Sequence, residues 1–280
     1  MRNFTFKGLL LTAVFMLLGC LSIQAANDDL ITKQITINLD KAGTLPNKIA
    51  SSEMYKITNL KIIGEINGTD WNMIREMAGR DNRGYGTEGK LSVLDLSEAK
   101  IVKGGDSYYP GDNCYTSNDE IGEKAFTDCS RLTSLTLPVG ITSIGYDAFA
   151  YCSGLTSLTL PAGITSIGEF AFSYCSGLTS IYVYAEKVPR IGRYAFKGCA
   201  SRKCTLYVPK GTYDNYRLSE FGYFENIVEF DATGIDKTTT STDVKEVSRF
   251  SADGQRLAVP VKGMNIVKYS DGSTRKVVVK

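Results

Sequence analysis

Residues 121–199 read IGEKAFTDCSRLTSLTLPVGITS, IGYDAFAYCSGLTSLTLPAGITS, IGEFAFSYCSGLTSIYVYAEKVPR and IGRYAFKGC, so one pattern is written four times in succession. Its glycine and its cysteine recur with a period of 23, and the last step is longer by one position. These positions are Gly122, Gly145, Gly168 and Gly192, and Cys129, Cys152, Cys175 and Cys199. A fixed period of roughly 20 to 50 residues is typical of a solenoid, whose coils bury their apolar faces against one another. The sequence therefore predicts a repeat solenoid, mainly β with short helices.

Alternation within each repeat predicts which side chains point into the coil. Leu135 and Leu137 stand two residues apart in a short strand, so they share the inner face, and Thr136 between them points outward. The Ala-Phe pair that includes Phe126 recurs in every coil and is expected to fill the core behind a turn. In the later coils, the outward positions are held by Thr159, Tyr182 and Tyr207.

The seven cysteines of the chain invite a disulfide interpretation, but four of them occupy one repeat position. Equivalent positions in stacked coils lie roughly 5 Å apart, like neighbours in a sheet. A disulfide requires Cβ atoms about 3.5–4.5 Å apart. We therefore predict an inward ladder of free thiols, in which cysteine acts as a small apolar residue and binds no metal. Whether Cys199 and Cys204 pair locally stays open.

The segment 1–25 is typical of an export signal, because Arg2 and Lys7 precede an apolar run that ends in small residues. This segment is excluded from the predicted fold. Residues 17–20, LLGC, also resemble a bacterial lipobox, in which Cys20 carries a lipid. Cleavage by ordinary signal peptidase and lipidation at Cys20 remain alternatives.

Changes in composition divide the chain further. Residues 231–243 are polar and rich in threonine, which indicates a linker. Two Asp-Gly pairs near the C-terminus stand between alternating runs and predict two β-hairpins. We expect a signal peptide at 1–25, an N-terminal cap and irregular repeat at 26–89, a solenoid with its C-terminal cap at 90–230, a linker at 231–243, and a small β-hairpin module at 244–280.

Local signals predict several elements outside the regular repeats. We expect a strand over residues 30–40, a short helix over 46–55, and a second helix with Thr69 or Asp70 as its N-cap. Trp71 is interpreted as a core residue. Residues 102–119 form a long, tyrosine-containing insertion, which makes it a second candidate contact region.

Charge and composition exclude several classes of function. Removal of the predicted export signal takes away Arg2 and Lys7 and no acidic residue, so basic and acidic residues become equal in number and nothing favours binding to nucleic acid. There is no histidine, which removes histidine-dependent catalytic arrangements and histidine-ligated zinc. We predict no catalytic residues, no metal site and no cofactor. The expected state is a monomer.

The repeat IG-x-x-AF-x-x-C-x-x-LTSLTLP-x-GITS resembles the bacterial surface leucine-rich repeat family of the BspA type. The resemblance covers Leu91 to about Phe230. It implies a right-handed leucine-rich repeat solenoid on the outside of a bacterial cell that binds host or microbial surfaces. The tail, with DGQRL and GMNIVKYSDGSTRKVVVK, is similar to the C-terminal sorting domains of type IX secretion substrates, although residues 264–267 replace the usual aromatic residue.

These observations lead to a functional hypothesis. The regular Leu-Thr-Leu strand becomes Ile-Tyr-Val-Tyr at residues 181–184, which places tyrosines on or beside the outer face. Tyrosine is frequent in binding sites because it offers apolar area and one hydroxyl at low entropic cost. We expect an exported protein, secreted or at the cell surface or outer membrane, that binds an extracellular protein or glycan. The candidate ligand-binding residues are Thr136, Thr159, Tyr182, Tyr184 and Tyr207. Contact with a membrane is expected only through a lipid anchor or surface sorting. The alternative function is a structural envelope spacer without a specific ligand.

Overall fold

The computed structural model describes residues 29–109, 114–232, 246–251, 256–257, 263–269 and 274–279. The chain divides into two compact units between Ala232 and Thr233. The predicted signal segment with Cys20, most of the predicted linker, and both Asp-Gly turns of the tail lie outside the described residues.

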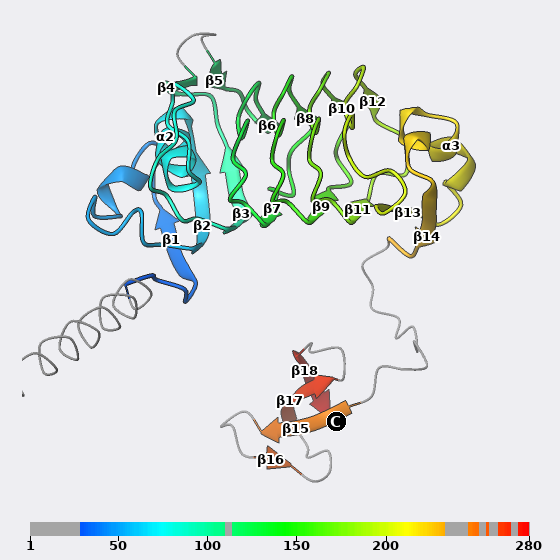
Figure 1. The fold of residues 1–280 in the computed structure, drawn as a ribbon. Helices are drawn as coiled ribbons and strands as arrows, with labels where there is room; N and C mark the ends of the chain where they lie inside the picture. The colour runs from blue at the N-terminus through cyan, green and yellow to red at the C-terminus, as the bar shows by residue number, and fades with distance from the viewer. Residues whose placement is uncertain are drawn as a thin grey trace, which may run out of the picture. The chain divides into compact units, whose positions relative to one another are not determined.

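The first unit is built on an eight-stranded parallel sheet (Figure 1). The strands follow one another in chain order, as expected when each coil adds one strand beside the last. Equivalent residues of neighbouring coils pair across the regular strands, for example Ser134 with Ser157 and Ser157 with Ser180. The strands are β1 (Ile35–Leu39), β2 (Asn59–Ile66), β3 (Val93–Ile101), β7 (Ser134–Thr136), β9 (Ser157–Leu160), β11 (Ser180–Val183), β13 (Thr205–Pro209) and β14 (Asn226–Phe230).

A second, narrower parallel sheet runs along the other side of the coils (Figure 1). Its strands are β6 (Glu120–Ile121), β8 (Ser143–Ile144), β10 (Ser166–Ile167) and β12 (Arg190–Ile191). The remaining elements of this unit are the 3-10 helix η1 (Leu45–Asn47), α2 (Gly68–Met77), the antiparallel pair β4 (Gly104–Tyr109) and β5 (Cys114–Thr116), α3 (Tyr213–Arg217) and the 3-10 helix η3 (Glu220–Tyr223).

The second unit is a small antiparallel sheet with the strand order β16-β15-β17-β18. β15 (Glu246–Ser251) pairs with β16 (Arg256–Leu257), and β17 (Gly263–Tyr269) pairs with β18 (Thr274–Val279). β15 also pairs with β17, which joins the two pairs of strands into one sheet.

A stack of phenylalanine rings fills the core behind the turns. The rings of Phe126, Phe149, Phe172 and Phe196 follow one another at centroid distances of 5.2, 5.0 and 5.5 Å, and all are buried. The inward placement of the strand leucines is also confirmed, since Leu135 and Leu137 are buried and Thr136 is exposed. Burial of this apolar area stabilises each coil only through its neighbours.

The turns of successive coils are joined by a ladder of backbone hydrogen bonds, which we call the turn ladder. The N–H groups of the first three core phenylalanines donate to the alanine carbonyl of the next coil, at 2.7 Å from Phe126 to Ala148, from Phe149 to Ala171 and from Phe172 to Ala195. The coils approach closely here, because a Cβ on Gly168 would lie 2.6 Å from the carbonyl carbon of Gly145. The repeated glycine is therefore a packing requirement at this position.

The N-terminal segment closes the first end of the turn ladder. Within the described part of the chain no earlier turn donates to the carbonyls of the first coil, and side chains take over this role. Tyr108 Oη donates to Glu123 O at 3.0 Å. Ala125 O accepts from Trp71 Nε1 at 3.0 Å and from Arg75 Nη1 at 2.9 Å. Trp71 also covers the first phenylalanine ring, so its predicted place in the core is confirmed.

Two local predictions in the N-terminal segment are wrong. The N-cap of α2 is Asn67, not Thr69 or Asp70, because the Asn67 side chain accepts from the Thr69 N–H and Asp70 accepts from the Asn67 N–H. This reciprocal arrangement is a capping box. Over residues 46–55 the structure has only the short η1 and turns instead of a longer helix.

Aromatic side chains close the other end of the core, as predicted. Phe221 and Phe224 pack on the ring of Phe196 at 5.3 and 5.1 Å between centroids. Tyr216, on α3, is buried and donates its hydroxyl to Ala185 O at 2.6 Å. The C-terminal cap therefore covers the ring stack.

The repeated cysteines form the predicted ladder of buried thiols. Cys152, Cys175 and Cys199 donate their Sγ–H to phenylalanine carbonyls at 3.0, 3.1 and 3.2 Å. Cys204 is also a buried free thiol, so the alternative in which it pairs with Cys199 is wrong. The thiols therefore act in packing.

Burial of the thiols predicts a loss of stability at alkaline pH. Desolvation raises the pKa of Cys129 from 9.0 to about 11. Because the folded state holds this proton more tightly than the unfolded state, its contribution is complete below pH 9 and is lost as the pH rises towards 11. We expect about 1 kcal/mol from this residue between pH 9 and 10. Urea unfolding of the parent and of Cys129→Ala at both pH values measures it; equal pH slopes for the two proteins would contradict it.

Candidate ligand-binding site

The outer face of the large sheet carries the predicted threonines. Thr136 and Thr159 are exposed and lie next to buried leucines on β7 and β9. Thr159 lies opposite Tyr182 in the sheet register. Thr136 is on the preceding strand, where it lies opposite Asp95. The structure thus brings Thr159 beside the predicted tyrosines and leaves Thr136 one strand further away.

Four aromatic side chains gather at the C-terminal end of this face. Tyr182 and Tyr207 lie opposite each other on β11 and β13, and their rings stack at 4.3 Å between centroids with 6° between their planes. Phe230 meets the rings of Tyr182 and Tyr184 edge-on at 6.0 and 5.1 Å. We call Tyr182, Tyr184, Tyr207 and Phe230 the sheet aromatic cluster.

The sheet aromatic cluster combines apolar surface with hydroxyl groups. Its three tyrosines are half-buried. Burial raises the pKa of Tyr182 above its ordinary value, and the neighbouring Tyr207 adds to the rise. The Tyr182 hydroxyl therefore stays protonated at neutral pH. Parallel strands hold the rings, so little side-chain freedom remains to be lost on binding.

Phe230 belongs to the site but was not predicted. It is the last residue of β14 and pairs with Pro209, two positions beyond Tyr207. The β-branched and aromatic residues in 226–230, NIVEF, are a signal for a strand, but only the added parallel pairing places this ring beside the tyrosines.

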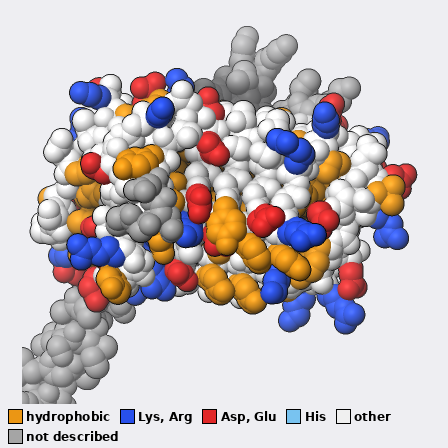
Figure 2. Space-filling model, turned by 90° about the horizontal axis from the view of Figure 1, so that it is seen from above, with side chains coloured by type: hydrophobic (Ala, Val, Ile, Leu, Met, Phe, Trp, Pro, Cys, Tyr) orange, Lys and Arg blue, Asp and Glu red, His pale blue; other side chains and the backbone are white. Residues whose placement is uncertain are grey.

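Sequence reasoning also missed a second group of aromatic side chains, in the turns of the coils. Tyr151 and Tyr174 stack at 4.9 Å, and Phe170 and Tyr194 at 5.4 Å. The Lys197 ammonium lies 6.0 and 5.5 Å from the rings of Tyr174 and Tyr194. We call Tyr151, Phe170, Tyr174 and Tyr194 the turn aromatic row. Exposed hydrophobic side chains are thus not confined to the strands, and Figure 2 shows a face where they form a band among scattered charges.

The turn aromatic row is built on unusual backbone. All four residues have positive φ, between 56° and 62°, a conformation that costs a residue with a side chain about 1–2 kcal/mol. In the last coil Gly198 takes the position that Tyr174 holds in the coil before, with a φ of 79°. Ring stacking between neighbouring turns offsets part of this cost.

The described parts of the insertion, residues 102–109 and 114–119, belong mainly to the N-terminal cap. It contains β4 and β5, and its Tyr108 is buried, which argues against a free contact surface at that residue. Tyr115 remains 54% exposed. Contact through the rest of this insertion, with Tyr109 and Tyr115, stays a prediction.

Other chemistry finds little support among the described residues. Within them, no three side chains of the kinds that bind metals lie together. Burial raises the pKa of Cys199 to about 12, so this thiol is a poor nucleophile at neutral pH. None of the helices in the described part of the chain is long and apolar enough to cross a membrane.

The repeat length, the parallel strand in each coil, and the Ala-Phe and cysteine ladders identify the type of repeat. Residues 113–221 form a BspA-type leucine-rich repeat region. The family model matches this stretch in six copies. The BspA-type region lies within the longer stretch 91–230 for which the resemblance was inferred. The similarity of the tail to sorting domains stays a prediction.

The other comparisons add little to this assignment. A leucine-rich repeat protein from Bacteroides ovatus of known structure is 22% identical to this chain, with a TM-score of 0.34. The match covers 71% of this chain and 42% of the length of that protein. No curated protein matches the chain.

Proposed function

We propose that this chain is an exported protein of the bacterial surface, or a secreted one, that binds an extracellular protein or glycan through the sheet aromatic cluster. The stacked pair of Tyr182 and Tyr207 carries the proposal. Aromatic rings held by a rigid sheet suit both the apolar faces of sugar rings and protein hot spots, and their hydroxyls add hydrogen bonds. Thr159 extends the same surface by one strand.

The repeat type supports the location. BspA-type leucine-rich repeat proteins are typically bacterial surface or secreted proteins. The charged start and apolar run of the segment 1–25 agree with export. Lipidation at Cys20 and surface sorting by the tail are two alternative means of retention, and mass spectrometry of the mature protein distinguishes them.

A structural spacer is the rival function. The exposed threonines at the other coils are also what an ordinary solvated sheet face carries. A screen of the chain from Asn27 onward against a glycan array and a panel of extracellular matrix proteins separates the two functions. We expect at least one saturable interaction in the micromolar range or tighter. Negative results on both panels would favour the spacer.

A further inference from the structure

The turn ladder has an open end at the last coil. In the coil before, Phe170 N donates to Arg193 O at 3.1 Å and Phe172 N donates to Ala195 O at 2.7 Å. The equivalent donors of the last coil are the N–H groups of Tyr194 and Phe196. Within the described residues neither group forms a hydrogen bond. Two backbone donors, two residues apart, thus point along the solenoid axis without an acceptor.

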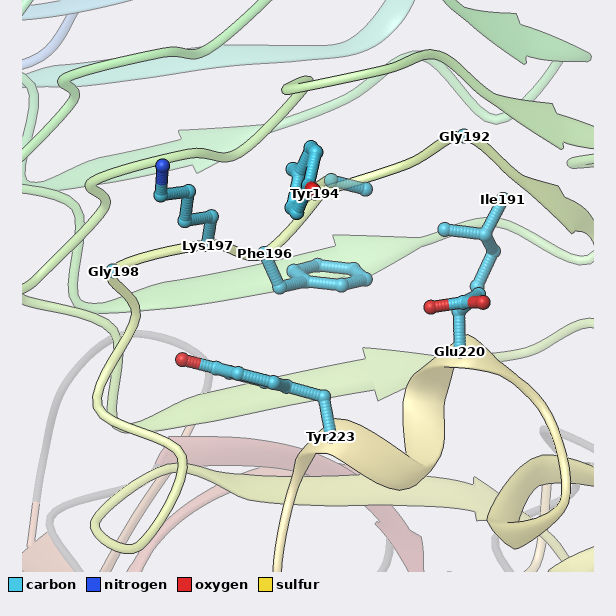
Figure 3. Close-up of a pocket in the computed structure, with 9 residues that line it drawn as sticks. Ile191, Gly192, Tyr194, Phe196, Lys197, Gly198, Glu220 and Tyr223 are labelled. Atoms are coloured by element: carbon cyan, nitrogen blue, oxygen red, sulfur yellow. The ribbon is translucent and has the colours of Figure 1, made fainter.

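These donors lie at a cavity. A space of about 190 Å³ lies between the last turn and η3 of the C-terminal cap, beside the contact of Phe221 with Phe196. Figure 3 shows Tyr194 and Phe196 on the turn side, with Glu220 and Tyr223 facing them from η3. Glu220 and Lys197, both exposed, are the acidic and the basic side chain of the lining.

The C-terminal cap forms hydrogen bonds with the backbone of the last turn only at Gly198 and Cys199 among the residues around this cavity. The Tyr223 hydroxyl lies against the Gly198 backbone and donates to Cys199 O at 2.9 Å. Burial raises the pKa of Tyr223, and a hydrogen bond from the backbone of Gly198 opposes the rise. The third donor position of the last turn is therefore occupied, whereas the first two are not.

The two ends of the turn ladder differ in which backbone groups remain without a hydrogen bond among the described residues. At the first coil, side chains already occupy the carbonyls of Glu123 and Ala125. Among the described residues, a second copy therefore offers no open carbonyl at the two positions that would match these donors in a head-to-tail arrangement. The open donors of the last coil need acceptors from another chain.

We propose that the cavity binds a turn-forming peptide segment of a partner protein, whose main-chain carbonyls continue the ladder. The preceding coil shows the geometry that fits: Arg193 O and Ala195 O, two residues apart, on the Phe170 and Phe172 N–H groups. Unpaired sheet and turn donors are a common basis of peptide capture. The cavity is lined by one acidic and one basic side chain, Glu220 and Lys197, so it carries no net charge that would attract a free anion in place of a neutral main chain. This site lies at the end of the coils and is independent of the sheet aromatic cluster.

Amide hydrogen exchange on the full chain first tests whether the Tyr194 and Phe196 N–H groups lack a hydrogen bond. We expect the Tyr194 and Phe196 amides to exchange at least tenfold faster than those of Phe170 and Phe172, because only the latter pair is hydrogen-bonded. Equal protection of all four amides would overturn the proposal.

Binding is tested by NMR titration of the full chain with the peptide RIGRYAFKG, the sequence of residues 190–198, which presents the carbonyls of a following coil together with basic residues. We expect saturable shifts centred on the Tyr194 and Phe196 amides. Glu220→Trp should fill the cavity and weaken binding at least tenfold, whereas Glu186→Trp, at an exposed position outside the cavity, should not.

Two outcomes of this titration contradict the proposal. One is the absence of saturable shifts at Tyr194 and Phe196, which would mean that only water occupies the cavity. The other is that sodium acetate reproduces the shifts while the peptide does not, which would assign the donors to small anions. Neither outcome bears on ligand binding at the sheet aromatic cluster.

Discussion

Phe172→Ala is expected to lower the free energy of unfolding of the solenoid unit by about 3–5 kcal/mol, the usual cost of deleting a buried aromatic ring. The ring is fully buried and stacks on Phe149 at 5.0 Å and on Phe196 at 5.5 Å, nearly parallel to both. In the variant, the rings of Phe149 and Phe196 each lose the contact with Phe172. The backbones of neighbouring coils are already close, so the coils cannot move together to fill the cavity.

The position of Phe172 within the stack also predicts a change in cooperativity. Coils interact only with their neighbours, so a gap in the third of the four repeats, between Phe149 and Phe196, uncouples the two sides of the solenoid. Urea unfolding measures both effects, with circular dichroism reporting the whole chain and the fluorescence of Trp71, the single tryptophan, reporting the N-terminal end. We expect the two probes to give different midpoints in the variant and one midpoint in the parent.

Val139→Ala is the matched control for this experiment. Val139 is an apolar residue of the same repeats, but it is 75% exposed. Its loss should change stability by no more than about 0.5 kcal/mol. A similar cost for both variants would show that the ring stack does not hold the coils together.

Trp71→Ala is expected to cost a comparable amount, about 3–5 kcal/mol. The indole ring covers Phe126 at 5.2 Å, and its Nε1–H donates to Ala125 O, a carbonyl that no earlier coil can serve. The substitution therefore removes apolar burial and one of the donors that close the turn ladder. Urea unfolding followed by circular dichroism measures the change.

Trp71→Phe separates the two contributions. A phenyl ring keeps most of the packing on Phe126 but loses the donor, and Arg75 Nη1 still reaches Ala125 O at 2.9 Å. We expect a cost of about 0.5–1.5 kcal/mol, the net value of one hydrogen bond. If Trp71→Phe costs as much as Trp71→Ala, the hydrogen bond and not the packing dominates the cap.

The repeated part of the fold could be predicted from the sequence because each coil repeats one set of physical requirements. The alternation around Thr136 fixed which strand residues point inward, and the shared spacing of Cys152 and Cys175 argued for packed thiols. The structure bears out both inferences. Because the pattern occurs four times, each inward or outward position is supported by several residues of the same type.

The caps and the turns were harder to predict because their contacts join segments far apart in the sequence. Nothing local indicates that Arg75 donates to the carbonyl of Ala125, 50 residues later. The capping role of Asn67 was missed because its pair with Gly68 also resembles a turn. The turn aromatic row escaped notice because Tyr174 occupies a backbone conformation usually given to glycine.

The candidate site was predicted in part. The change from leucine to tyrosine at Tyr182 and Tyr184 predicts aromatic side chains on this coil, and the structure places Tyr182 and Tyr207 opposite each other on one face. The edge-on ring of Phe230 required the three-dimensional register of the last strand.

The most direct measurement compares two matched pairs of stacked tyrosines on a ligand found in the screen. Tyr182→Ala with Tyr207→Ala removes a pair at 4.3 Å on the strand face, and Tyr151→Ala with Tyr174→Ala removes a pair at 4.9 Å in the turns. We predict that affinity falls at least about 30-fold for the strand pair, since the loss of even one hot-spot tyrosine costs about 2 kcal/mol or more and hot-spot losses do not simply add. The turn pair should stay within about threefold of the parent, the margin of a near-neutral contact. Unchanged affinity in the strand variant, or a loss confined to the turn variant, would contradict the placement of the binding site on the sheet aromatic cluster.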